Sequence, residues 1–144
     1  MVMKIHAGAI GSAILLALAL AAPVFAGSVL KASCPCGYKT ELMVGGGMAN
    51  FQTFCAAPAY CAGSKKLELL NYLDDNPKCA SGTGKPVFYN DPSLQEKPPA
   101  GTAPGIVFSW NLEKKGVFLL PDVGYLCPHC GKKTMRFAQV GFWD

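Results

Sequence analysis

The sequence predicts a mainly β fold of short antiparallel strands joined by tight turns. Runs rich in Val, Phe, Thr and Tyr alternate with Gly, Pro and Asn, a pattern typical of short strands and the turns between them. Two tight turns also carry pairs of cysteines, at residues 34–37 (C-P-C-G) and 127–131 (C-P-H-C-G). We call them the first and second thiol turns. Tight turns of this kind connect short strands, so both observations favour the same fold class.

Residues 1–26 are predicted to be a signal peptide. Lys4 supplies a positive charge, residues 7–22 form an apolar run, and Ala26 is a small residue before the expected cleavage site. The apolar run is shorter than the ~20 residues that a membrane-spanning helix needs. We therefore expect export to the periplasm or the extracellular space, with no stable membrane insertion after cleavage.

The remaining residues, 27–144, have the usual length of one domain, and we expect them to form one. The 13 basic and 9 acidic residues of the whole chain give a net charge of +4, which falls to +3 once Lys4 is removed. This charge is small and scattered along the sequence. The composition therefore predicts no nucleic-acid partner.

In the first half of this domain, strands are predicted at residues 29–32 and 38–44, on either side of the first thiol turn. Further strands are predicted at residues 51–55 and 87–89. Residues 65–75 fit either a helix or a strand, because their leucines suit both periodicities. A strand is preferred here, since the neighbouring segments are strands.

In the second half, residues 94–105 are predicted to be an exposed proline-rich loop. Residues 106–110 and 117–120 are apolar and flank a polar turn, which predicts a β-hairpin. The second thiol turn follows, and residues 134–143 are predicted to form the last strand. The aromatic side chains expected to help fill the core from this strand are Phe137, Phe142 and Trp143.

The two thiol turns together predict one metal site. A C-x-x-C turn aims both of its sulfurs at one point, and a tetrahedral ion needs four ligands. The first thiol turn is the similarly compact partner, although its C-x-C spacing is less regular. The expected metal ligands are Cys34, Cys36, Cys127 and Cys130.

The C-P-C-G-Y and C-P-H-C-G-K motifs, together with remnants of similar turns between them, resemble small bacterial zinc-ribbon proteins built from several C-P-x-C-G knuckles. The resemblance is specific at the two ends of the domain. It implies a small zinc-ribbon-like domain, a structural zinc ion and no catalytic role. A rubredoxin-like iron centre, which uses the same four-thiolate geometry, stays an alternative to zinc, as does copper. The implied function is that of a degenerate, exported member that acts as a binding or scaffold module.

Cys61 and Cys79 each lie in a turn that retains one half of such a knuckle. In an oxidising compartment thiols form disulfides unless a metal holds them, so these two are a candidate disulfide. Cys55 would then be the odd thiol of the seven cysteines. The alternative is that all three are separate buried residues, since cysteine packs well as a small hydrophobe.

Two other functions remain open at this stage. Cys127-Pro128-His129-Cys130 resembles the active-site motif of periplasmic thiol oxidases with a thioredoxin fold, although Gly131 follows where a helix should continue. The C-x-C turn would also suit a soft-metal protein that binds copper. No separate histidine-based catalytic pair is present in the expected mature chain, so no catalytic residue is assigned. A protein partner is open, and its identity is not predicted.

Overall fold

The computed structural model describes residues 27–144, and these residues are mainly β. The expected class of short antiparallel strands is confirmed: the described strands form two three-stranded sheets and one two-stranded sheet, all antiparallel. The predicted signal peptide, residues 1–26, lies outside the described residues. Within the described part, no helix is long and apolar enough to cross a membrane.

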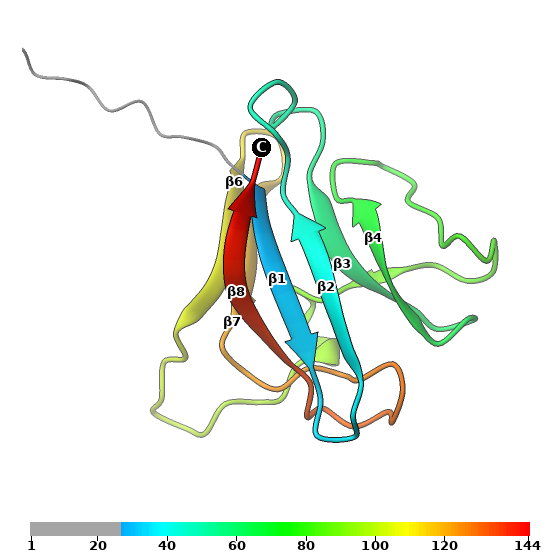
Figure 1. Cartoon of the computed structure of the whole chain (residues 1–144), viewed down its shortest axis with the longest axis vertical. Helices are drawn as coiled ribbons and strands as arrows, with labels where there is room; N and C mark the ends of the chain where they lie inside the picture. Colours follow the sequence, from blue (N-terminus) through cyan, green and yellow to red (C-terminus); the bar gives the residue numbers. More distant parts are fainter. Residues whose placement is uncertain (1–26) are drawn as a thin grey trace, which may run out of the picture.

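The first sheet has the order β2-β1-β8, with β1 (Gly27–Ser33) between β2 (Lys39–Val44) and β8 (Arg136–Trp143). The first described strand thus pairs with the last one. Gly27 lies opposite Trp143, and Ser33 lies opposite Arg136. As a result, the connection from β1 to β2 and the chain entering β8 meet at one end of the sheet (Figure 1).

The second sheet has the order β4-β3-β5. It contains β3 (Ala56–Cys61), β4 (Lys66–Asn71) and the very short β5 (Val87–Phe88). An isolated bridge between Gly45 and Ala56 links the end of β2 to the start of β3, so the two sheets lie next to each other (Figure 1). A single 3-10 turn, η1 (Pro92–Leu94), follows β5 and is capped by the Asp91 carboxylate, which accepts from the Ser93 N–H.

The third sheet is the hairpin of β6 (Ile106–Leu112) and β7 (Gly116–Pro121), which lies behind β1 and β8 in Figure 1. Its side chains alternate between buried and exposed, as expected for a strand pair with one face against a core. Phe108, Trp110 and Leu112 on β6 point inward, while the residues between them are exposed. The hairpin predicted from the sequence is therefore confirmed, with slightly longer strands.

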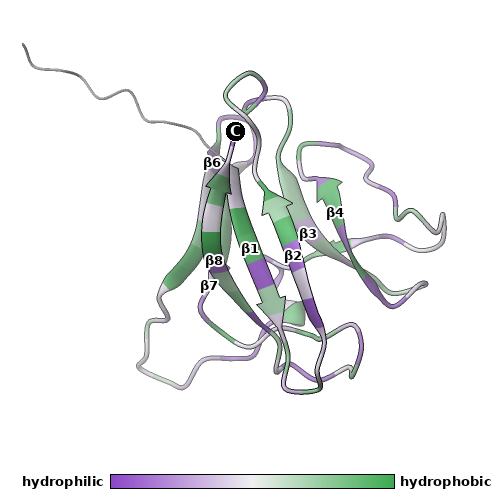
Figure 2. Cartoon of the chain, in the orientation of Figure 1, coloured by the Kyte–Doolittle hydropathy of each residue, from purple (hydrophilic) through white to green (hydrophobic). Residues whose placement is uncertain are grey.

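The core lies between this hairpin and the first two sheets. Figure 2 shows the hydrophobic stretches of β1, β2 and β8 side by side on the facing sheet. Trp110 packs so closely against Gly45 that a Cβ atom there would lie 2.7 Å from the indole ring, so only glycine fits. Burial of each large side chain contributes about 1.5–3 kcal/mol. The largest fully buried side chains are Tyr89, Tyr125, Phe118, Leu30, Leu112, Leu120, Met135 and Val44.

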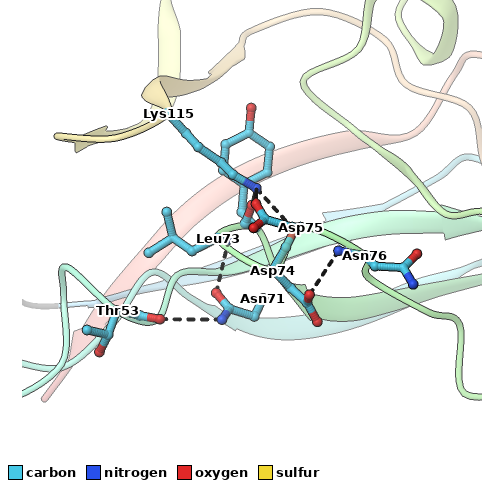
Figure 3. Close-up of polar contacts among 8 residues, drawn as sticks. Thr53, Asn71, Leu73, Asp74, Asp75, Asn76 and Lys115 are labelled. Atoms are coloured by element: carbon cyan, nitrogen blue, oxygen red, sulfur yellow. Dashed lines mark hydrogen bonds and ion pairs between the residues drawn. The ribbon is translucent and has the colours of Figure 1, made fainter.

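The tip of the β6–β7 hairpin contacts the turn that follows β4 through the side chain of Lys115. The Lys115 ammonium group donates to the carbonyl oxygens of Tyr72 and Asp74, both at 3.1 Å, and lies 3.5 Å from an Asp75 carboxylate oxygen (Figure 3). The same ammonium lies 5.9 Å from the centre of the Tyr72 ring. These contacts hold the hairpin against the second sheet at one edge of the core.

The strand predicted at residues 51–55 was wrong, because this segment forms turns instead. The Asn50 carbonyl accepts hydrogen bonds from the N–H groups of Thr53 and Phe54, and the Asn50 side chain accepts from Gly47. Local side-chain bonds of this kind compete with strand pairing. Strand β3 begins only at Ala56. By contrast, the preference for a strand within residues 65–75 was correct, since β4 lies there.

Of the three aromatic residues predicted to lie in the core, Phe137 is buried as expected, whereas Phe142 and Trp143 are more exposed. Phe142 is 73% exposed. It lies beyond the register shift opposite Val29/Leu30, where the alternation of buried and exposed side chains along β8 is interrupted, whereas Phe137 lies before the shift. Trp143 is half-buried: its ring covers Gly27, and its indole N–H donates to the Val44 carbonyl at 3.1 Å. The core placement of Phe142 was therefore wrong.

Candidate metal centre

The first thiol turn is the connection between β1 and β2. The Cys34 N–H donates to the Tyr38 carbonyl and the Gly37 N–H donates to the Cys34 carbonyl, both at 2.9 Å. Gly37 has a φ of +96°, in the left-handed region that glycine adopts without steric cost. The hairpin thereby closes tightly and presents both cysteines at the lower end of the sheet (Figure 1).

The second thiol turn has the same backbone pattern. The Cys127 N–H donates to the Lys132 carbonyl and the Gly131 N–H donates to the Cys127 carbonyl, both at 2.8 Å. Gly131 also has a positive φ, of +71°. Just outside the turn, Tyr125 and Met135 exchange two backbone hydrogen bonds, so the segment is a small hairpin leading into β8.

Buried neighbours fix the position of the second thiol turn. The Tyr89 hydroxyl donates to the Leu126 carbonyl at 2.9 Å, and the Leu126 N–H donates to the Leu94 carbonyl at 2.8 Å. The Tyr89 ring is fully buried, and burial raises the pKa of its hydroxyl, which therefore remains a proton donor. These bonds attach the turn to η1 and to the segment after β5. They were not foreseen from the sequence, because the partners are far apart along the chain.

The two thiol turns face each other and bring the four predicted ligands together. The four sulfur atoms all lie within 4.8 Å of one another. The Cys34 and Cys130 sulfurs are 3.8 Å apart, and the Cys36 and Cys127 sulfurs are 3.7 Å apart. Four Zn–S bonds of ~2.3 Å at tetrahedral angles would place the sulfurs about 3.8 Å apart. The cluster is therefore positioned to hold one metal ion.

The four thiols differ in their surroundings. Cys34 and Cys127 are buried, Cys130 is partly exposed and Cys36 is exposed. Burial raises the pKa of the Cys127 thiol to about 12, and the thiols of Cys34 and Cys36 add to this increase. By contrast, a hydrogen bond with the Thr134 hydroxyl at 3.3 Å is the main cause that lowers the pKa of Cys34 to about 6.

Four thiolates cannot share so small a volume unless a cation balances their charge. Each further ionisation beside an existing thiolate is disfavoured by like-charge repulsion. A coordinated metal ion reverses this, because its positive charge deprotonates the thiols that bind it. The donor set, the spacing and the partial burial of the cluster therefore all fit a soft or borderline metal ion.

Two further residues, Thr134 and His129, contact sulfur atoms of the cluster, and the sequence did not predict these contacts. Thr134 lies just after the second thiol turn and contacts Cys34. His129 lies inside that turn, and its Nδ1 atom is 3.6 Å from the Cys36 sulfur. His129 was noticed only as part of the C-P-H-C motif. The position of His129 between Cys127 and Cys130 could have indicated this contact, because the middle residues of a tight turn lie near its cysteines.

The other three cysteines lie in the neighbourhood of the second sheet. Cys61 and Cys79, the pair suggested by the sequence, are joined by a disulfide with an S–S distance of 2.08 Å. The Glu68 carboxylate lies beside this pair and accepts from the Ala80 N–H at 2.7 Å. Cys55 is a free, fully buried thiol, and burial raises its pKa to about 12.

The geometry around Cys127 differs from that of a thioredoxin-type thiol oxidase. In that fold the first cysteine opens a helix, whose N-terminus lowers the pKa of its thiol. Here residues 127–135 form turns and lead into β8, and burial raises the pKa of Cys127 instead. Cys127, which would be the nucleophile of a thiol oxidase, thus lacks the helix N-terminus that lowers the thiol pKa in that fold.

Comparison of the chain with protein-family models, with curated proteins and with solved structures finds no match in any of the three. The fold and the site define the class by themselves: a mainly β protein with a four-cysteine cluster positioned to hold a metal ion.

Proposed function

We propose that this chain is an exported, non-enzymatic protein in which Cys34, Cys36, Cys127 and Cys130 hold one structural zinc ion. The observation that carries the proposal is the separation of the paired sulfurs, 3.7 and 3.8 Å, which matches the edge of a tetrahedral Zn–S₄ centre of about 3.8 Å. In this centre the ion joins the first hairpin of the described chain to the segment that leads into its last strand.

A structural role is favoured over a catalytic one by the number of protein ligands. Catalytic zinc sites use three protein ligands and keep the fourth position for water or substrate, whereas structural sites are closed by four. Four thiolates close this site. His129, the one histidine of residues 27–144, lies beside Cys36 and has no partner base within the cluster of four cysteines.

Zinc is preferred over iron and copper. Zinc has no geometric preference of its own and accepts tetrahedral four-thiolate sets, which are common in structural sites. The likeness of both thiol turns to the C-P-x-C-G knuckles of zinc-ribbon proteins supports the same choice. Iron in a rubredoxin-like centre and Cu(I) remain the alternatives that direct metal analysis separates from zinc.

Within this proposal the protein works as a binding or scaffold module. A site that is closed by four ligands supplies rigidity rather than chemistry, and it fixes the relative position of the strands around it. The predicted signal peptide supports export to the periplasm or the extracellular space, where the Cys61–Cys79 disulfide would also be stable. The partner is expected to be a protein, and its identity is left to experiment.

Elemental analysis of the purified protein tests the metal site. We expect one zinc ion per chain in the wild type and none in Cys127→Ser, with Cys55→Ala retaining the wild-type stoichiometry as the matched control. A wild-type protein without bound metal, with Cys34 or Cys36 in a disulfide, would overturn the proposal. Iron or copper in place of zinc would overturn the choice of ion and keep the centre.

Thiol alkylation separates the metal centre from the redox alternative. We expect chelator alone to make the buried cluster cysteines, Cys34 and Cys127, reactive toward iodoacetamide, because removing the ion releases their sulfurs. A redox-active Cys127–Cys130 pair would instead respond to reductant and ignore the chelator. Mass spectrometry of the labelled peptides identifies which cysteines react in each condition.

A further inference from the structure

The four cysteines of the centre are not equivalent. Cys34 and Cys127 are buried at the foot of β1 and in the second thiol turn, so their sulfurs are held by the surrounding core. Cys36 is exposed and sits in the irregular C-x-C turn. It is therefore the ligand most open to alkylation or oxidation from solvent, since reactivity follows exposure.

An imidazole lies directly beside this exposed ligand. The Nδ1 atom of His129 is 3.6 Å from the Cys36 sulfur. Two ligands on one tetrahedral zinc ion, with a Zn–S bond of ~2.3 Å and a Zn–N bond of ~2.0–2.1 Å, place sulfur and nitrogen about 3.6 Å apart. The His129 Nδ1 atom thus lies one ligand spacing from the position that the Cys36 sulfur occupies, at the exposed side of the four-cysteine cluster.

We propose that His129 is a reserve metal ligand that replaces Cys36 when the Cys36 sulfur is lost to modification. The centre then has two coordination states, one with four thiolates and one with three thiolates and the His129 Nδ1. This inference rests on the proposed metal centre and deepens it. Its biological consequence is that the structural ion survives damage to the ligand that solvent reaches most easily.

The exchange needs no oxidant or reductant. When iodoacetamide alkylates Cys36, the sulfur forms a bond to carbon and iodide leaves. The bond between the metal and the resulting thioether breaks, and a lone pair of His129 Nδ1 forms a metal–nitrogen bond in its place. For a divalent ion the net charge of the centre and its ligands changes from −2 to −1. The three remaining thiolates, among them both buried ones, continue to anchor the ion to the two thiol turns.

Titration of the full chain with Co²⁺ tests the inference, because tetrahedral Co²⁺ reports its ligands in the visible spectrum. We expect Cys36→Ser to bind one Co²⁺ per chain, with weaker sulfur-to-cobalt charge transfer and d–d bands shifted to shorter wavelength, as imidazole replaces thiolate. Affinity should fall about 10-fold or more again in Cys36→Ser/His129→Ala. His129→Ala alone should keep the wild-type spectrum, and Cys127→Ser should bind no Co²⁺.

The possible outcomes separate the two proposals. A wild type that binds no Co²⁺ or Zn²⁺ removes the metal centre itself. A wild type that binds normally, with a Cys36→Ser variant that binds none or that binds equally well without His129, leaves the centre in place and overturns the reserve ligand. In those cases His129 serves at most as a hydrogen-bond neighbour of the thiolate.

A second measurement avoids any dependence on the folding of the Cys36 variants. Brief treatment of the zinc-loaded wild type with iodoacetamide should alkylate Cys36 first, and native mass spectrometry should show the alkylated chain still carrying its ion. The same treatment of zinc-loaded His129→Ala should release the ion together with alkylation. Equal release from both proteins would overturn the proposal.

Discussion

At the residue scale, the five free cysteines show how local surroundings make one functional group behave in different ways. Cys34 has a lowered pKa because it shares a hydrogen bond with Thr134, whereas burial raises the pKa values of Cys127 and Cys55. Cys127 and Cys55 are nevertheless distinct, since only Cys127 has other sulfurs within reach of a shared ion. Burial alone thus does not distinguish a metal ligand from a packing residue.

The buried Cys55 thiol makes stability depend on pH in a defined direction. Its pKa is raised to about 12, whereas an unfolded cysteine ionises near pH 8.5, so between about pH 8.5 and 12 only the unfolded chain loses this proton. The Cys55 contribution to stability is therefore complete below about pH 8.5 and declines as the pH rises through that window. We expect Cys55→Ala to lack this decline.

The measurement is chemical denaturation of wild type and Cys55→Ala at about pH 8 and about pH 10. The variant should be less stable by about 1 kcal/mol at the lower pH, because a small buried group is lost, and this advantage of the wild type should be lost at the higher pH. A difference that is constant or widens with pH would contradict the expected pKa. Serine is a poorer replacement here, since its hydroxyl would be buried at a fully enclosed position.

At the element scale, the glycine that closes the second thiol turn can be compared with a glycine in the β6–β7 hairpin. Gly131 and Gly116 have φ values of +71° and +76°, and a Cβ atom at either position would meet no heavy atom within 4 Å. Alanine at either site therefore costs only backbone strain, about 1–2 kcal/mol. Of these two glycines, only Gly131 lies in a turn that carries cysteines of the four-cysteine cluster.

We expect Gly131→Ala and Gly116→Ala to lower the free energy of unfolding by similar amounts. Gly131→Ala should also weaken zinc binding by about tenfold, because relaxing the strained turn displaces Cys130, while Gly116→Ala should leave zinc affinity unchanged. Competition with a chromophoric chelator measures both affinities. Equal zinc affinity in the two variants would show that the second thiol turn is not coupled to the ion.

The second sheet includes one of the two cysteines of the Cys61–Cys79 disulfide. Cys61 ends β3, and Cys79 lies 18 residues further along the chain. Closing a loop of this length in the unfolded chain is worth about 3 kcal/mol. We expect the double variant Cys61→Ala/Cys79→Ala to lose about this much stability in denaturation experiments and to keep one zinc ion per chain. Loss of the ion as well would show that the two centres are coupled.

The elements that could be predicted from the sequence are those specified by neighbouring residues. The β6–β7 hairpin has apolar arms on either side of a polar turn, and β4 contains three leucines, so these strand assignments were correct. Residues 51–55 have suitable strand residues, yet the hydrogen bonds of Asn50 hold them in turns. The core placement of Phe142 was wrong because the register shift between β1 and β8, which changes the side-chain alternation, is not encoded in neighbouring residues.

The same distinction applies to the metal centre. Each thiol turn could be recognised from local spacing, and pairing the two followed from the four ligands that a tetrahedral ion needs. The contacts of Thr134 and Tyr89 could not be recognised, because they depend on how β8 and η1 pack against segments far away in the sequence. Long-range packing, rather than residue type, supplies that information.

At the scale of the whole molecule, the four-cysteine cluster brings together residues that are 96 positions apart, Cys34 and Cys130. Structural zinc in small domains has an apparent binding free energy of ~10–16 kcal/mol, which exceeds the ~5–15 kcal/mol by which most domains are stable. We expect chelation to lower the Tm of the wild type strongly and Cys127→Ser to match the chelated protein. Calorimetry with and without chelator measures this, and an unchanged Tm would contradict a structural ion.

The central place of β1 in its sheet has a consequence for when the chain can fold. This strand leaves the ribosome first among the described elements, yet one of its two neighbours is β8, which is made last. Until β8 emerges, one edge of β1 has no partner and the nascent chain cannot complete the sheet. Topologies with such distant pairings fold slowly. Late folding would suit the proposed export, because a polypeptide that must pass through a narrow translocation channel has to arrive there still unfolded.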